Sequence, residues 1–102
     1  IIQHIGLEPI NEIVPNEYNL LQNYPNPFNP STSISFDIIK QTQTILKVYD
    51  ITGRLTSVLV NESLRAGSYK VELNAGNLSS GVYFYKLEAG NFIQTRKMIL
   101  LK

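Results

Sequence analysis

The sequence contains no cysteine and no tryptophan, and only one histidine and one methionine. Without cysteine, neither a disulfide framework nor a thiolate metal site is possible. The single histidine, His4, has no cluster of carboxylates beside it, so we expect no metal site and no cofactor. Apolar runs stay well short of the roughly 20 residues that a membrane-spanning helix requires.

Charged residues are also scarce in this chain. Asp, Glu, Lys and Arg make up 17% of the 102 residues, and the formal net charge is +1. A nucleic acid or an anionic membrane as main partner would require a basic stripe, which this composition does not supply. The length leaves room for one domain. Because the sequence starts with Ile1 rather than Met, we expect any export signal to lie upstream of it.

No arrangement of residues points to catalysis. A serine or threonine nucleophile needs a neighbouring base, and the only histidine lies in a segment that we interpret as a linker. The carboxylates are spread along the chain as Glu8, Glu12, Glu17, Asp37, Asp50, Glu62, Glu72 and Glu88. Those within the predicted strands fall mostly on outward faces, so they are interpreted as solvated charges. We therefore expect neither an enzyme nor a small-molecule substrate.

What the sequence does contain is a repeated alternation of apolar and polar residues. In its first clear instance, Ile34, Phe36 and Ile38 alternate with polar neighbours, as they do in a strand with one buried face. Turn signals separate seven such segments, which lie at residues 20–24, 32–38, 46–48, 55–60, 69–73, 82–89 and 92–101. We therefore predict an all-β chain, folded as a seven-stranded antiparallel immunoglobulin-like β-sandwich.

Residues 1–19 do not follow this pattern. Pro9 and Pro15 interrupt them, and polar residues dilute the apolar ones. We interpret residues 1–19 as a linker or as the tail of a preceding domain, and residues 20–102 as the single domain. Ile1, Ile2, Ile5 and Leu7 leave open a short strand that pairs with a neighbouring domain.

A proline-rich segment, Tyr24-Pro25-Asn26-Pro27-Phe28-Asn29-Pro30, opens the domain. Residues before a proline avoid the helical region and proline cannot donate to a sheet, so we expect an extended segment at a sheet edge. Phe28 has no polar group and is expected to close one end of the core. The segment also has the spacing of proline-rich ligands for aromatic grooves, but it is short, and a structural role is favoured.

Two turns and an aromatic strand carry further signals. Asp50 to Gly53 has Asp at the first position of a turn and Gly where a positive φ is tolerated. Arg54 follows it, either as a local ion-pair partner or as a recognition feature. Residues 78–83 have the pattern of a tyrosine corner. In the strand Tyr83–Tyr85 the tyrosines and the phenylalanine between them cannot share a face, and tyrosines that faced outward could stack on a sugar.

In this order the motifs resemble the C-terminal sorting domain, type A, of proteins exported by the type IX secretion system of Bacteroidetes-like bacteria. The matching segments are Tyr24–Phe28, Ser31–Phe36, Val48–Arg54, Ala66–Tyr69, Leu78–Tyr85 and Lys97–Leu101. The family is related to the immunoglobulin-like domain of flagellar hook-cap proteins. That domain usually has a Trp-Asp-Gly segment where this chain has Leu73–Gly76, which favours the sorting domain.

The resemblance implies that the domain is the C-terminal secretion signal of a larger secreted protein. An upstream signal peptide would carry the cargo domain of the same chain across the inner membrane, and the sorting domain would then fold in the periplasm. The implied partners are the outer-membrane translocon, shuttle and sortase components of the type IX system. The linker would be cut, and the cargo would be secreted or attached to the cell surface. We expect a monomer.

The resemblance also assigns sorting motifs to particular residues. They are Tyr24, Pro25, Asn26, Pro27, Phe28, Asp50, Gly53, Arg54, Gly81, Tyr83, Lys97, Met98 and Leu100. We expect the Gly53-Arg54 turn and the last strand to form the recognised surface, because Arg54 stands on a rigid turn and Lys97 lies near the end of the chain.

Two other classes of function stay open on the sequence. One is a non-catalytic β-sandwich that serves as a binding or spacer module of a secreted protein, for a carbohydrate or for surface adhesion. Such a module would bind its ligand saturably when isolated, whether or not it is exported. The other is a structural domain that stabilises its parent protein without affecting transport.

Overall fold

The alternation in the sequence becomes eight strands in the structure, a computed structural model that describes residues 7–11 and 13–102. The strands are β1 (Glu8–Asn11), β2 (Asn19–Leu20), β3 (Ser31–Ile38), β4 (Thr42–Asp50), β5 (Leu55–Leu64), β6 (Gly67–Asn74), β7 (Gly81–Ala89) and β8 (Phe92–Leu100). No helix in this part of the chain is long and apolar enough to span a membrane. His4, Ile1, Ile2 and Ile5 lie outside the described residues.

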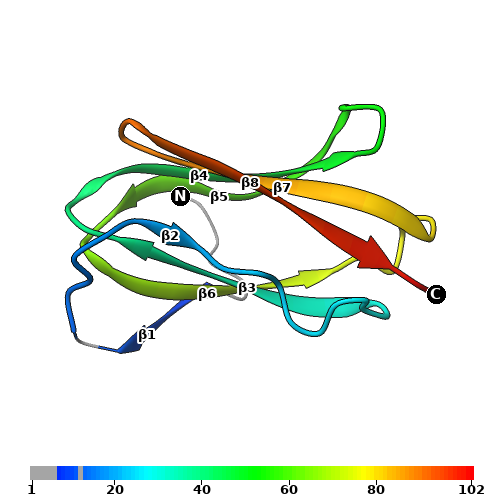
Figure 1. The fold of residues 1–102 in the computed structure, drawn as a ribbon, viewed down its shortest axis with the longest axis horizontal. Helices are drawn as coiled ribbons and strands as arrows, with labels where there is room; N and C mark the ends of the chain where they lie inside the picture. Colours follow the sequence, from blue (N-terminus) through cyan, green and yellow to red (C-terminus); the bar gives the residue numbers. More distant parts are fainter. Residues whose placement is uncertain (1–6, 12) are drawn as a thin grey trace.

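The strands form two antiparallel sheets of four strands each. One sheet has the order β1-β6-β3-β2 and the other has the order β5-β4-β7-β8. Figure 1 shows them as two layers, with β4, β5, β7 and β8 above and β1, β3 and β6 below. One hydrophobic cluster, drawn from both sheets, fills the space between the layers. The all-β, antiparallel part of the predicted fold class is therefore confirmed.

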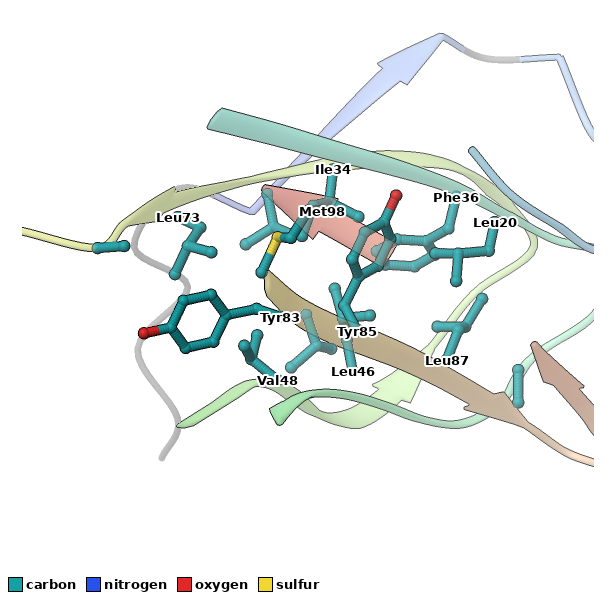
Figure 2. Close-up of a cluster of buried hydrophobic side chains, with 14 of the residues drawn as sticks. Leu20, Ile34, Phe36, Leu46, Val48, Leu73, Tyr83, Tyr85, Leu87 and Met98 are labelled. Atoms are coloured by element: carbon teal, nitrogen blue, oxygen red, sulfur yellow. The ribbon is translucent and has the colours of Figure 1, made fainter. Parts of the chain in front are cut away.

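Strands β3 and β7 show how the alternation produces the core. Every second residue of β3 is buried, from Thr32 to Ile38, and its neighbours are only partly buried. In β7 the buried residues include Tyr83 and Tyr85, whereas Phe84 faces outward. Figure 2 shows both tyrosines reaching from β7 into the cluster. This decides the question that the sequence left open about the aromatic strand, because tyrosines buried in the core are not available to stack on a sugar.

The described residues hold one strand more than the seven predicted. The additional strand, β1, lies in the segment interpreted as a linker and pairs with β6, where Glu8 lies opposite Lys70. Pro9 is tolerated because β1 is an edge strand, where a missing N–H group disturbs only one side of the ladder. The boundary between linker and domain at residue 20 stays a prediction.

Strand β5 is longer than the sequence suggested. It continues from Val60 to Leu64, through residues that have little β propensity, because Asn61, Glu62 and Ser63 pair in register with β4. Pairing with a neighbouring strand overrides a weak local preference.

Two predictions of local structure, the hairpin turn before Phe92 and the tyrosine corner, are confirmed. Ala89 pairs with Phe92 across a two-residue turn whose Gly90 has a φ of 60°. The hydroxyl of Tyr83 donates a hydrogen bond to the backbone oxygen of Ser79 at 2.7 Å, which is the geometry of a tyrosine corner.

A buried hydroxyl joins the two layers. The hydroxyl of Tyr85, on β7, donates to the backbone oxygen of Leu21 at 2.7 Å and accepts from the backbone N–H of Asn23 at 2.8 Å. Both partners follow β2, which belongs to the other sheet. Burial raises the pKa of Tyr85, so the hydroxyl keeps its proton.

We expect Tyr85→Phe to lower the free energy of unfolding by about 1–3 kcal/mol, because the buried N–H of Asn23 loses its acceptor. Urea denaturation of the 102-residue chain measures this change. Tyr24→Phe is the matched control. Tyr24 is 80% exposed, and its hydroxyl has no hydrogen-bond partner among residues 7–11 and 13–102. Equal stability of the two variants would contradict the role of Tyr85.

Candidate recognition surface

The proline-rich segment and the last strand lie side by side, although about 70 residues separate them. The N–H of Phe28 donates to the oxygen of Ile99 at 3.0 Å, and the N–H of Leu101 donates to the oxygen of Phe28 at 3.0 Å. Phe28 and Leu100 form a parallel bridge. The segment therefore extends the sheet beyond β8 by one short parallel pairing.

Side chains complete this edge where the prolines cannot. The backbone N–H of Ile99 donates to the side-chain oxygen of Asn26 at 3.0 Å. The side-chain nitrogen of Gln22 donates to the backbone oxygen of Lys97 at 2.8 Å. Pro25 and Pro27 lack N–H groups and therefore cannot donate to β8. The side-chain amides of Gln22 and Asn26 form hydrogen bonds to β8 in their place. The edge of β8 is thus closed from Lys97 to the end of the strand.

Inside the segment, a second set of hydrogen bonds holds the loop. The side-chain nitrogen of Asn23 donates to the backbone oxygen of Pro25 at 3.1 Å and to the hydroxyl oxygen of Thr32 at 3.0 Å. The Thr32 hydroxyl in turn donates to the oxygen of Pro25 at 2.8 Å. Phe28 is only 2% exposed, as predicted for a residue that closes the core.

The turn after β4 is organised by one carboxylate. The Oδ1 atom of Asp50 accepts from the N–H of Thr52 at 2.9 Å, from its hydroxyl at 2.6 Å and from the N–H of Arg54 at 3.1 Å. The Thr52 hydroxyl is the main reason why the pKa of Asp50 falls from 3.8 to about 2. Gly53 has a φ of 89°, which favours glycine. Asp50 is therefore the cap of this turn.

Arg54 lies at the surface of the same turn. Its Nε atom is 3.3 Å from Oδ2 of Asp50, but its side chain is 81% exposed. An exposed pair of this kind contributes little to stability, so the guanidinium remains accessible to a partner.

The last residue of the sequence reaches back to the tyrosine corner. The backbone N–H of Lys102 donates to the hydroxyl of Ser80 at 2.9 Å. Its ammonium donates to the oxygens of Gly76 at 2.7 Å and Leu78 at 2.9 Å. The chain end, the corner and Gly81 at the start of β7 are thus held together.

These pairings bring the predicted motifs to one end of the molecule. Asp50 is opposite Tyr83, and Gly81 is opposite Leu100, which bridges to Phe28. In Figure 1 the green turn after β4, the yellow corner before β7, the cyan proline segment and the red chain end all lie on the right. We call this the motif end.

The predicted residues differ in exposure at the motif end. Phe28, Tyr83, Met98 and Leu100 are buried in the core. Asp50 is partly buried, and the exposed members are Tyr24, Pro25, Asn26, Pro27, Gly53, Arg54, Gly81 and Lys97. The four core residues are not accessible to a partner. Sequence reasoning missed Gln22, Asn23 and Tyr85, whose roles depend on residues far away in the chain.

The part of the chain that the structure describes contains no group of three or more His, Cys, Asp or Glu residues that could hold a metal ion. What the arrangement provides is a rigid display of exposed side chains.

Comparison with known proteins agrees with the motif order. Residues 22–101 match the family described as the secretion system C-terminal sorting domain. This chain belongs to that family. The sorting domain is a C-terminal signal for type IX secretion of an attached cargo protein, which is secreted across the outer membrane or attached to the cell surface. The family is a sorting signal rather than a catalytic domain. A search of curated proteins finds no match to the chain.

We expect Phe28→Ala to lower the free energy of unfolding of the sorting domain by about 3–5 kcal/mol, because it leaves a cavity in a closed core. Chemical denaturation measures the loss. Tyr24→Ala, four residues earlier and exposed, should change stability by no more than about 0.5 kcal/mol. A similar small effect for both would mean that the proline-rich segment is not anchored through Phe28.

We expect the Asp50 turn to weaken in acid. A carboxyl whose pKa is lowered from 3.8 to about 2 on folding stabilises the folded state above pH 3.8 and loses that contribution as the pH falls towards 2. The stability difference between the native chain and Asp50→Asn should therefore shrink across this range. NMR titration of the carboxyl gives the pKa directly, and Thr52→Val should move it back towards 3.8. An unshifted pKa in the native chain would refute the cap.

Proposed function

We propose that the outer-membrane translocon recognises this sorting domain through the exposed residues of its motif end, after the domain has folded in the periplasm. Shuttle and sortase components then receive it, the upstream segment is cut, and the cargo is released or anchored. The observation that carries the proposal is the gathering of exposed residues from distant motifs, among them Asn26, Arg54 and Lys97, on one rigid end of the molecule.

Rigidity matters for this recognition because an ordered surface loses little conformational entropy on binding. The side chain of Asn26 is held by Ile99, and the Arg54 turn is held by Asp50. The side chain of Asn26 and the backbone of the Arg54 turn therefore have fixed positions before a partner arrives.

The exposure of the segment between β1 and β2 supports a cut upstream of the domain. Ile13 is 76% exposed and Val14 is 61% exposed. Exposed connections are the preferred sites of proteolysis. β1 and β2 are each paired with a strand of the sheet, so we place the accessible part of the tether between them.

The strand order supports an immunoglobulin-like sandwich as the type of fold. Strands β2, β3 and β6 occupy the positions A, B and E of such a domain, and β8, β7, β4 and β5 occupy G, F, C and C′. β1 then takes the place of strand D beside β6. Tyr83, whose hydroxyl forms the tyrosine corner, lies near the start of the strand that corresponds to F, where immunoglobulin-like domains have it.

The covered sheet edges support a monomer. β1 covers part of the edge of β6, and the proline-rich segment covers part of the edge of β8. The edge strand β5 is irregular where it pairs with β4, next to Leu46 and Val48, and such bulges oppose edge-to-edge pairing.

The proposed function is tested by placing residues 1–102 behind a signal peptide and a fluorescent protein. We expect fluorescence outside cells that have the type IX machinery and periplasmic retention in a translocon-deficient strain. An Arg54→Ala, Lys97→Ala double variant should fold but be exported less, since both side chains are exposed. Retention of the native fusion in both strains would refute the sorting role, and full export of the double variant would refute recognition at these residues.

A further inference from the structure

The two outer faces of the molecule differ in chemistry. On the central strands β3 and β6 of one sheet, the outward residues are polar, namely Ser31, Ser33, Ser35, Asp37, Ser68, Lys70, Glu72 and Asn74. Ile10 on the edge strand β1 and Tyr24, which bridges to Ser33, are exposed apolar side chains near them. Many of the polar residues satisfy one another, since the Ser68 hydroxyl donates to Asp37 at 2.7 Å and the Ser33 hydroxyl donates to Glu72. We call this surface the serine face.

The outer face of the other sheet carries aromatic and aliphatic side chains. Across the strands, Leu55 lies opposite Tyr49 and Tyr49 lies opposite Phe84. Residues that lie opposite one another share a face of the sheet, and their buried neighbours Val48 and Tyr85 point into the core. We define the aromatic face as Tyr49, Leu55, Val58, Val82, Phe84 and Ile99.

Two lysines lie within the aromatic face. Lys47 lies directly opposite Lys86, with Val58 beside it on the next strand. The ammonium of Lys86 is satisfied, because it lies 3.2 Å from Glu88 and 5.5 Å from the centre of the Tyr49 ring. Lys47 has no ion-pair partner in the described part of the chain. A third lysine, Lys97, lies opposite Phe84 and is exposed.

This combination of apolar surface with the unpaired ammonium of Lys47 and the exposed side chain of Lys97 indicates the chemistry of a partner. We propose that the aromatic face is a docking surface for a protein of the type IX machinery, which presents an apolar patch with a carboxylate over the Lys47–Lys86 pair. The inference rests on the proposed sorting function and extends its recognition surface from the motif end across the outer face of β4, β7 and β8. Lys97 belongs to both surfaces.

A protein partner fits this face better than a lipid surface does. The lysines lie between apolar rows rather than around them, so insertion into a bilayer would bury the ammonium of Lys47 in hydrocarbon. A protein can place a carboxylate over the lysine pair and an apolar side chain over Tyr49 and Phe84. A second copy of this chain is disfavoured because its own aromatic face would oppose lysine with lysine.

A charge reversal at Lys47 should leave folding intact and reduce export. Lys47→Glu replaces the like-charge pair by an opposite-charge pair, so we expect stability at or above that of the native chain. The same change puts a negative charge where we place the partner's carboxylate, so export of the fluorescent fusion should fall about tenfold or more. Lys40→Glu makes the same substitution in the exposed turn between β3 and β4, away from the aromatic face, and should be exported like the native chain.

One export experiment separates the two proposals. If the native fusion is not exported, the sorting function itself fails. If it is exported and Lys47→Glu is exported equally well, the docking surface is wrong and the sorting function stands. Protease resistance in the periplasm of the translocon-deficient strain checks folding, and a Lys47→Glu chain that is digested there would contradict our account of the lysine pair.

A photoreactive amino acid in place of Phe84 identifies what covers the face, and the same group at Ser35 is the control on the serine face. In cells that export the fusion, we expect the probe at position 84 to crosslink to an outer-membrane protein of the secretion machinery and the probe at 35 not to do so. Crosslinks from position 84 to a second copy of the chain, to lipid or to nothing would overturn the proposal.

Discussion

The edge of β8 is an open row of backbone donors and acceptors, and closing it is the constraint on which the rest of the structure depends. The proline-rich segment closes it with the backbone of Phe28 and the side chains of Gln22 and Asn26. The same contact places Phe28 in the core and seals one end of it. An unclosed edge on an exported, transiently unprotected domain would invite association with other chains.

The closure also explains why the motifs gather at one end. The segment that precedes β3 and the strand that ends the chain meet through Phe28 and Leu100, and β7 connects them to the turn capped by Asp50. The buried members of the motifs hold the exposed members in place. The sorting motifs therefore combine buried residues, whose substitution would destabilise the domain, with exposed residues, which we propose take part in recognition.

The two outer faces of the domain differ in how their polar and charged groups are paired. Polar side chains of the serine face form hydrogen bonds with one another, as the Ser68 hydroxyl does with Asp37. The aromatic face instead contains Lys47, which has no ion-pair partner among the described residues, opposite Lys86, which is paired with Glu88. In our proposal the two faces have separate roles, because the serine face stays in contact with water and the aromatic face binds the transport machinery.

Local patterns in the sequence were enough to predict the all-β class, the inward set of β3, the hairpin at Gly90, the Asp50 turn and the tyrosine corner, because each depends on neighbours within a few residues. They were not enough for β1, for the last residues of β5, for the burial of Tyr85 rather than Phe84, or for the apposition of Phe28 with Leu100. These features depend on which strands pair and in which register. The free energy of that pairing comes from contacts between residues far apart in the chain, so only the folded structure decides it.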